Sequence, residues 1–353
     1  MKLPKLQRLG FFSRLVDDAT AAERYRLVTE QIVHAEAFGF DTAWVAQHHF
    51  HAAEGGLPSP LVFLASVAAR TQRIRLGTGI VTLPLENPVR VAEDAAVLDL
   101  ISDGRLEFGV GTGGTPSSFT AFGQESDQRA AVFARHLALV RGAWAGRPLP
   151  GGDRLYPTAP QLSERIWQAS FSESGGTRAG RAGDGLMLSR TQPRTANTPH
   201  ASLAVLQLPI IAAYLAALPE GHAPRIAGSR SVFVANDRAL ARRLAEDGLR
   251  RSWTRQVDPA QPRSIPTLDE LIARQDVHVG TPDDVVASLR ADRTLQHVTD
   301  LVCQVHSIDP PHAHVLRSIE LIATEVAPAL GWSGPTGNGS HATSTISPFA
   351  VFA

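Results

Sequence analysis

The sequence of this chain predicts a closed (β/α)8 barrel, in which eight parallel strands alternate with helices. Three observations favour it. Residues 73–114 hold a complete strand–helix–strand unit. Similar units recur about eight times, and the repeats occupy about 330 residues, a length typical of such barrels. An open doubly wound sheet usually has fewer strands and a single glycine-rich fingerprint.

The unit at 73–114 shows how each element is encoded. Apolar residues alternate from 74 to 81 and then, after two prolines, recur at helical spacing. Gly104 stands where a helix commonly ends in a left-handed residue, and the next strand stops at a glycine-rich turn. Thr20 with Glu23, and the TPDD sequence at 281–284, have the pattern of helix starts, and Gly39 follows the first helix. The expected strands are residues 8–12, 42–46, 74–81, 106–110, 166–171, 185–188, 231–235 and 301–305.

Composition predicts a soluble, single-domain enzyme over residues 1–332. Hydrophobic residues make up 43% and charged residues 19%, and the formal net charge is +0. This balance gives no argument for binding nucleic acid or an anionic membrane. The first residues lack a signal-peptide core and no apolar run approaches the ~20 residues of a membrane span, so we expect a cytoplasmic location. Cys303, the single cysteine, excludes an internal disulfide and is expected to be a buried thiol.

Three segments do not follow the repeat. Residues 148–160 are rich in Gly and Pro and predict a surface loop. Residues 258–280 form a long connection near the seventh strand, which predicts a lid-like insertion or else a disordered loop. Residues 333–353 are low in charge and rich in Gly, Ser and Thr, which predicts a disordered tail.

Gln47, His48, His49 and His51 follow the second strand, at the end of a barrel where active sites lie. An imidazole there can act as acid, base or charge stabiliser near neutral pH. The histidines could instead pack under a loop, or bind a metal ion. Against a metal, adjacent histidines on an extended segment point to opposite faces, and no carboxylate stands at ligand spacing.

The segment after the fifth strand, FSESGGTRAG at 171–180, predicts a helix whose first turn offers hydroxyls and backbone N–H groups to a phosphate. Ser and Gly are also ordinary helix-capping residues. The phosphate interpretation gains weight from the glycine-rich turns at 77–79 and 111–114, which should lie around the same barrel mouth. Together they describe a nucleotide-like ligand with a planar ring.

In combination these motifs resemble the bacterial luciferase-like, flavin-dependent monooxygenases. The match runs from the first strand to about Trp332. The segments that carry the resemblance are GFDTAWVAQHHF, LGTGIVTLP, NPVRVAEDAAVLDLISDGR, LEFGVGTGG, SESGGTRAG and VGTPDDV. The resemblance implies that reduced FMN, supplied by a separate flavin reductase, reacts with O2 to give a C4a-peroxyflavin that oxidises a small organic substrate. The sequence does not identify this substrate.

The resemblance also assigns roles. It implies that His48 is catalytic and His49 more structural, and that Gly79 and Ile80 stand where some relatives have a non-proline cis peptide. Gln47 replaces the usual acid of the family, Thr112 an arginine of luciferase and Gly111 its reactive cysteine. The expected cofactor-binding residues are Thr78, Gly79, Ile80, Gly111, Thr112, Gly113, Glu173, Ser174, Gly175, Gly176, Thr177, Ser189 and Arg190.

Three alternatives stay open: an F420-dependent oxidoreductase of the same fold, a non-catalytic flavin-binding subunit, and a metal-dependent barrel hydrolase. We also expect a homodimer that pairs through the helices expected at 60–70 and 88–102. These helices carry small residues that allow close packing, although the same residues could pack inward on the barrel. They are Ala65, Ala68, Ala69, Ala92, Ala95 and Ala96.

Overall fold

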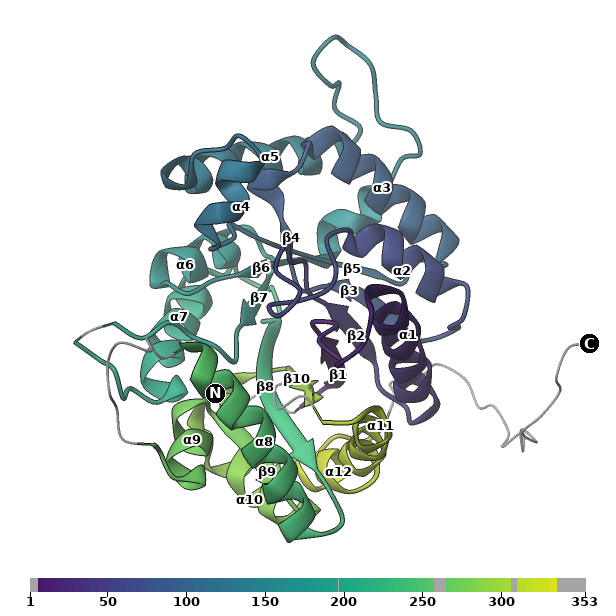
Figure 1. Ribbon diagram of the computed structural model, residues 1–353. Coiled ribbons are helices and arrows are strands. Elements are labelled where there is room, and N and C mark those ends of the chain that lie inside the picture. The colour runs from purple at the N-terminus through teal and green to yellow at the C-terminus, as the bar shows by residue number, and fades with distance from the viewer. Residues whose placement is uncertain (1–5, 196, 257–264, 306–309, 335–353) are drawn as a thin grey trace, which may run out of the picture.

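A computed structural model describes residues 6–195, 197–256, 265–305 and 310–334 and confirms the closed parallel barrel. In Figure 1 the strands surround the centre and the helices form an outer ring. Each barrel strand pairs in parallel with its neighbours, and pairing of β8 with β10 closes the circle. The barrel strands are β1 (Arg8–Ser13), β2 (Thr42–Val45), β3 (Arg75–Thr78) continued by β4 (Val81–Thr82), β5 (Leu106–Gly111), β6 (Ile166–Ala169), β7 (Gly185–Leu188), β8 (Ile226–Val234) and β10 (Asp300–Gln304).

The helix boundaries follow the punctuation of the sequence. The Thr20 hydroxyl accepts from the N–H of Glu23, and Gly39 and Gly104 have φ angles of 90° and 71°. Thr281 and Asp284 form a reciprocal capping box. The helices are α1 (Ala21–Ala37), α2 (Pro60–Ala68), α3 (Pro88–Ile101), α4 (Pro116–Ala121), α5 (Arg129–Trp144), α6 (Glu173–Arg181), α7 (Leu203–Ala217), α8 (Arg238–Gln256), α9 (Leu268–Arg274), α10 (Pro282–Ala291), α11 (His312–Leu321) and α12 (Ala327–Ala329).

The seventh barrel strand is longer than the sequence predicts. It begins at Ile226, because its first half pairs with β7 and β10. The expected range, 231–235, covers only its second half, which pairs with an additional strand, β9 (Val277–Gly280). Residues 227–230 read AGSR, a sequence of low strand propensity that barrel pairing overrides.

The segments that do not follow the strand–helix repeat differ in structure. The loop at 148–160 is largely exposed, and the connection between α5 and β6 projects from the barrel in Figure 1. Of the insertion expected at 258–280, the described part forms α9, with Leu271 fully buried, and β9. That a lid forms here stays a prediction. Residues 258–264 and the tail at 335–353 lie outside the described residues.

Two tryptophans fill the middle of the barrel. Trp44 and Trp167 are fully buried and meet edge to face, with ring centroids 5.7 Å apart. Gly77 and Gly185 make room for them, since a Cβ at either glycine would lie 2.2 Å from an indole carbon. The sequence suggests that glycine at 77 leaves space for a flat ligand. That interpretation is wrong, because Trp44 occupies the space.

Cys303 is buried on β10, and burial raises the pKa of its thiol to about 12. It is therefore a protonated, unreactive thiol at neutral pH, as the sequence predicts. No helix in the described part of the chain is both long and apolar enough to span a membrane.

Candidate functional site

The predicted site residues lie at the carboxyl ends of the barrel strands. His48 follows β2, Ile80 links β3 to β4, and Arg190 follows β7, and Arg14, which the sequence did not indicate, follows β1. Because all these strands are parallel, their carboxyl ends meet at one mouth. The fold therefore gathers at one end of the barrel residues that are as much as 176 positions apart in the chain.

His48 is a neutral imidazole held in a defined place. Its backbone N–H donates to Leu57 (2.9 Å), and its ring packs so closely on Gly55 that a Cβ there would lie 2.4 Å from Nδ1. Burial, followed by the nearby positive charge of Arg14, His49 and Arg190, lowers the pKa of His48 to about 4. Nδ1 is buried without a hydrogen-bond partner among the described residues. At neutral pH this ring can thus accept a proton or bind a ligand atom.

Gln47 fixes the strand end from which His48 extends. Its Nε2 donates to the carbonyl of Pro58 (3.0 Å) and to the Glu86 carboxylate (2.6 Å), and its Oε1 accepts from the N–H of Thr82 (2.7 Å). One buried amide therefore joins the loop after β2 to β4 and to the start of α3. This explains the departure from the acid that relatives have here, because a carboxylate at 47 would face the carboxylate of Glu86.

His49 lies in an aromatic cluster at the rim. Its ring centroid is 4.8 Å from that of Phe122 and 5.7 Å from that of Phe50, and the two phenylalanine rings are 5.9 Å apart. Phe50 is 67% exposed and has a positive φ of 65°. His51 is exposed, with Nε2 3.3 Å from the Ser117 hydroxyl. His49 thus packs against aromatic rings at the rim, in keeping with the structural role expected for it.

The turn after β3 has the backbone geometry that the resemblance implies. The Gly79–Ile80 peptide bond is cis. The Thr78 hydroxyl donates to the carbonyl of Gly109 (2.8 Å) and accepts from its N–H (2.9 Å), so this side chain joins β3 to β5 and only its backbone is left for a ligand. A Cβ on Gly111 would lie 3.0 Å from the Ile80 side chain.

The residues after Gly111 line the mouth and are partly exposed. Thr112 is partly exposed, and Gly113 has a φ of 72°, which favours glycine. A Cβ on Gly113 would also lie 2.4 Å from the Thr82 side chain. The segment around Gly113 and the segment around Thr82 are therefore neighbours at the mouth.

The helix expected to bind phosphate is α6, and its N-cap lies two residues earlier than the sequence suggests. Ser172, not Ser174, is the N-cap, and its hydroxyl accepts from Gly175 N (3.2 Å) and lies 3.1 Å from the Ser174 hydroxyl. Glu173 and Ser174 are exposed, and Thr177 is partly exposed. The N–H groups of Glu173 and Ser174, in the first turn, have no partner within the helix and can bind an anion, whereas Thr177 lies in the second turn and can offer its hydroxyl.

The glycines of α6 serve packing. A Cβ on Gly175 would lie 1.9 Å from the Ser170 hydroxyl, and one on Gly176 would lie 2.5 Å from the carbonyl of Ile210 on α7. Gly180 approaches Tyr214 in the same way, at 2.4 Å. These glycines let α6 lie against α7, and the N–H groups of Gly175 and Gly176 already donate to Ser172.

The loop after β7 supplies further polar groups. Arg190 donates to Gln304 and, at 3.3 Å, to the Ser231 hydroxyl inside the barrel. The Ser189 hydroxyl caps the turn by accepting from Thr191 N (3.1 Å). Gln192 is 5% exposed; its Nε2 donates to the carbonyl of Phe171, while its Oε1 is buried without a partner among the described residues.

Sequence reasoning missed Arg14, Ser172 and Gln192. A serine before Glu173 was a visible capping signal for Ser172. Nothing in the sequence marks Arg14 or Gln192, because only strand register brings them to the mouth.

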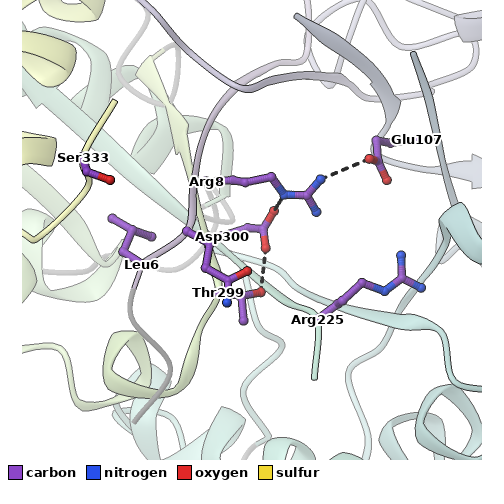
Figure 2. Close-up of a pocket in the computed structure, with 8 residues that line it drawn as sticks. Leu6, Arg8, Glu107, Arg225, Thr299, Asp300 and Ser333 are labelled. Atoms are coloured by element: carbon purple, nitrogen blue, oxygen red, sulfur yellow. Dashed lines mark hydrogen bonds and ion pairs between the residues drawn. The ribbon is translucent and has the colours of Figure 1, made fainter. Parts of the chain in front are cut away.

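The histidine cluster does not form a metal site. Nowhere among the described residues do three His, Cys, Asp or Glu side chains come together in a way that could hold a metal ion. A cavity of about 500 Å³, which Figure 2 shows, lies at the opposite, amino-terminal end of the barrel around Arg8 and Asp300. It is separate from the candidate site.

Proteins with similar sequences include monooxygenases and F420-dependent enzymes. The family profile described as luciferase-like monooxygenase matches residues 9–299. An uncharacterized protein, y4vJ of Sinorhizobium fredii, is 29% identical over 336 residues, 88% of this chain and 93% of that protein. An F420-dependent glucose-6-phosphate dehydrogenase of Kribbella flavida is 31% identical over 184 residues, which cover 47% of this chain and 54% of that enzyme.

Solved structures agree in fold. Monooxygenase RslO1 from Streptomyces bottropensis superimposes with a TM-score of 0.74 at 27% identity and covers 91% of this chain and 99% of its own. The oxygenating constituent of 3,6-diketocamphane monooxygenase from Pseudomonas putida, in complex with FMN, has a TM-score of 0.72 at 20% identity, with 95% and 100% covered. The chain therefore belongs to the luciferase-like monooxygenase family of oxidoreductases.

Proposed function

We propose that this protein is a monooxygenase that uses reduced FMN, delivered by a separate flavin reductase, to insert one oxygen atom of O2 into a small organic substrate. The observation that carries the proposal is His48. It is neutral, it has a buried nitrogen without a hydrogen-bond partner among the described residues, and it lies at the mouth of a barrel of this family.

The residues at the mouth fit an FMN molecule. The exposed first turn of α6, with Ser172, Ser174 and Thr177, would hold the phosphate through hydroxyl and N–H donors. The exposed Glu173 carboxylate would repel it, so Glu173 contributes its N–H alone. The backbone around Ile80 and Thr112 would face the ring. When bound, the flavin supplies the oxygen chemistry.

The remaining work falls to the chain's own side chains. His48 accepts a proton from the substrate, or holds the reacting group by a hydrogen bond. Arg14 and Arg190 lower the pKa of His48 and so favour its neutral, basic form. The aromatic cluster of His49, Phe50 and Phe122 restricts water at the rim.

Binding titrations test the cofactor. Replacing Ser174 and Thr177 by alanine should weaken FMN binding by roughly 1–3 kcal/mol, the scale of charge-assisted hydrogen bonds. Thr254→Ala, on the exposed face of α8, is the matched control and should bind FMN normally. Unchanged affinity in the double variant contradicts the phosphate assignment.

An F420-dependent oxidoreductase is the second candidate, favoured by relatives that use this cofactor. Parallel titrations with FMN and F420 separate the two, and tighter binding of F420 would replace the proposal. The substrate class can then be approached by screening small molecules for faster oxidation of the reduced cofactor.

We further propose a homodimer, for a different reason than the sequence suggests. Ala68, Ala92, Ala95 and Ala96 are buried within the subunit, so these small residues pack inward. The exposed apolar side chains of α2 and α3 are Val62, Val97, Leu100 and Ile101.

Light scattering at micromolar concentration tests the dimer. The wild type should have the mass of two chains, and Leu100→Asp with Ile101→Asp should shift it to one. Val205→Asp, at an exposed position of α7, is the matched control. A monomeric wild type contradicts the dimer.

A further inference from the structure

The cavity at the amino-terminal end of the barrel is lined by two arginines and two carboxylates. It has a volume of about 500 Å³, in the range of small-molecule sites. Figure 2 shows Arg8, Glu107, Arg225 and Asp300 around it, with dashed lines joining Arg8 to both carboxylates but none reaching Arg225.

The acceptors of this cavity are already used. One oxygen of Glu107 accepts from Arg8 and Arg75, and the other accepts from Trp167 Nε1 (2.6 Å). One oxygen of Asp300 accepts from Arg8 Nε (2.6 Å), and the other from the Thr299 hydroxyl (2.6 Å). All four carboxylate oxygens are therefore engaged by the protein.

Donors, by contrast, are left over. Arg225 Nη2 donates to the carbonyls of Ile166 (3.2 Å) and Gly183 (3.4 Å). Within the described residues its Nε and Nη1 make no hydrogen bond, and it forms no ion pair. Arg8 also keeps Nη2 without a partner there. The cavity thus offers N–H donors and no unused carboxylate acceptor.

Charge and shape lead to the same class of ligand. Three arginines, at 8, 75 and 225, face the two carboxylates, so one positive charge is left over at Arg225. The guanidinium carbons of Arg8 and Arg225 lie 5.3 and 5.1 Å from the centre of the same Trp167 ring. Stacking on one buried ring orients both guanidinium groups before any ligand arrives.

We propose that this cavity binds a small oxyanion, a phosphate or carboxylate group, between Arg225 and Arg8. Guanidinium groups bind such oxygens in pairs of parallel hydrogen bonds. The cavity is larger than a phosphate ion and has room for an organic remainder. This site is at the opposite end of the barrel from the proposed FMN site.

Calorimetric titration of the full chain with inorganic phosphate tests the proposal. The starting protein carries Ser174→Ala and Thr177→Ala, which weakens phosphate binding at α6, and every titration is matched in ionic strength with chloride. Adding Arg225→Gln should weaken phosphate binding roughly tenfold or more, the loss expected for charge-assisted hydrogen bonds. Adding Arg135→Gln, the same charge change at an exposed position of α5, should leave it unchanged.

Two further arms complete the experiment. Arg225→Lys keeps the positive charge but cannot form two parallel hydrogen bonds to the oxyanion, so it should weaken phosphate binding several-fold. This variant replaces Arg225→Gln in the experiment if Arg225→Gln does not fold. Acetate in place of phosphate decides between the two oxyanions. The proposal is overturned if neither ion binds beyond the effect of chloride, or if both Arg225 variants bind phosphate like the starting protein.

Discussion

The two ends of this barrel are built in opposite ways. At the amino-terminal end, Glu107 and Asp300 have side chains only 4% and 3% exposed, and each oxygen has a protein donor. At the carboxyl-terminal mouth, His48 Nδ1, His49 Nε2 and Gln192 Oε1 are buried without partners among the described residues.

An unpartnered buried polar atom costs stability, roughly 1–3 kcal/mol each. A protein keeps such atoms where a ligand or a reaction uses them. The carboxylates at the amino-terminal end therefore stabilise the barrel, whereas the unpartnered atoms at the mouth are available to the ligand proposed above.

The largest effect is expected at the mouth. His48→Ala should fold and bind FMN but lose substrate oxidation by roughly 10²–10⁴-fold, the usual value of a general acid or base. Reduced flavin should still react with O2 and release peroxide. Product formed per reduced flavin, measured beside thermal stability, checks this. Preserved coupling with a lowered melting temperature would show that His48 only supports its loop.

At the other end the loss should be in stability. Glu107→Ala leaves Arg8 and Arg75 without their shared carboxylate and should lower the free energy of unfolding by about 3–5 kcal/mol. Glu93→Ala breaks an exposed ion pair with Arg90 on α3 and should cost under about 1 kcal/mol. Denaturant unfolding measures both. Equal losses in the two variants would remove the distinction between the buried network and the surface.

Gln47→Glu should make the mouth sensitive to pH. The new carboxylate faces Glu86, so the pKa of one of the two rises in the folded state. Stability is then retained at low pH, where the pair shares a proton, and falls by roughly 1–3 kcal/mol as pH rises through the raised pKa. Gln47→Met, the control, should lose stability equally at all pH values. A flat profile for Gln47→Glu would mean that the two side chains move apart.

His48 should also make the protein sensitive to acid. Its folded pKa of about 4 is below the ordinary histidine value of 6.5, so the unfolded chain binds the proton more readily. The free energy of unfolding should fall as pH drops from 6.5 towards 4, by up to about 1.4 kcal/mol per pH unit for one histidine.

His278 gives an internal comparison, because burial also lowers its pKa to about 4, away from the mouth. His48→Gln and His278→Gln should each make the acid limb of the stability profile shallower. Unfolding measured between pH 4 and 7 checks both. An unchanged limb in His48→Gln would mean that this ring is already protonated in the folded protein.

The sequence by itself determined the barrel, most of its strand positions and the end where chemistry is expected. Hydrophobic periodicity, caps such as Thr281 with Asp284, and glycines at positive φ are local signals, and local signals can be read from the chain. They predicted a strand end before His48 and a helix near Ser174, although the N-cap of α6 is Ser172. They also identified Gly79–Ile80, where the peptide bond is cis.

Only the tertiary structure decided what the remaining residues do. β8 extends through the AGSR segment, and β9 pairs with its second half. Pairing with strands far along the chain outweighs the low strand propensity of this segment. In the packed structure Gly77 makes room for the Trp44 ring, and Gly176 allows α6 to contact α7. The arginine pair on Trp167 and the position of the Gln192 amide likewise depend on which side chains meet across the barrel, and no local pattern carries that information.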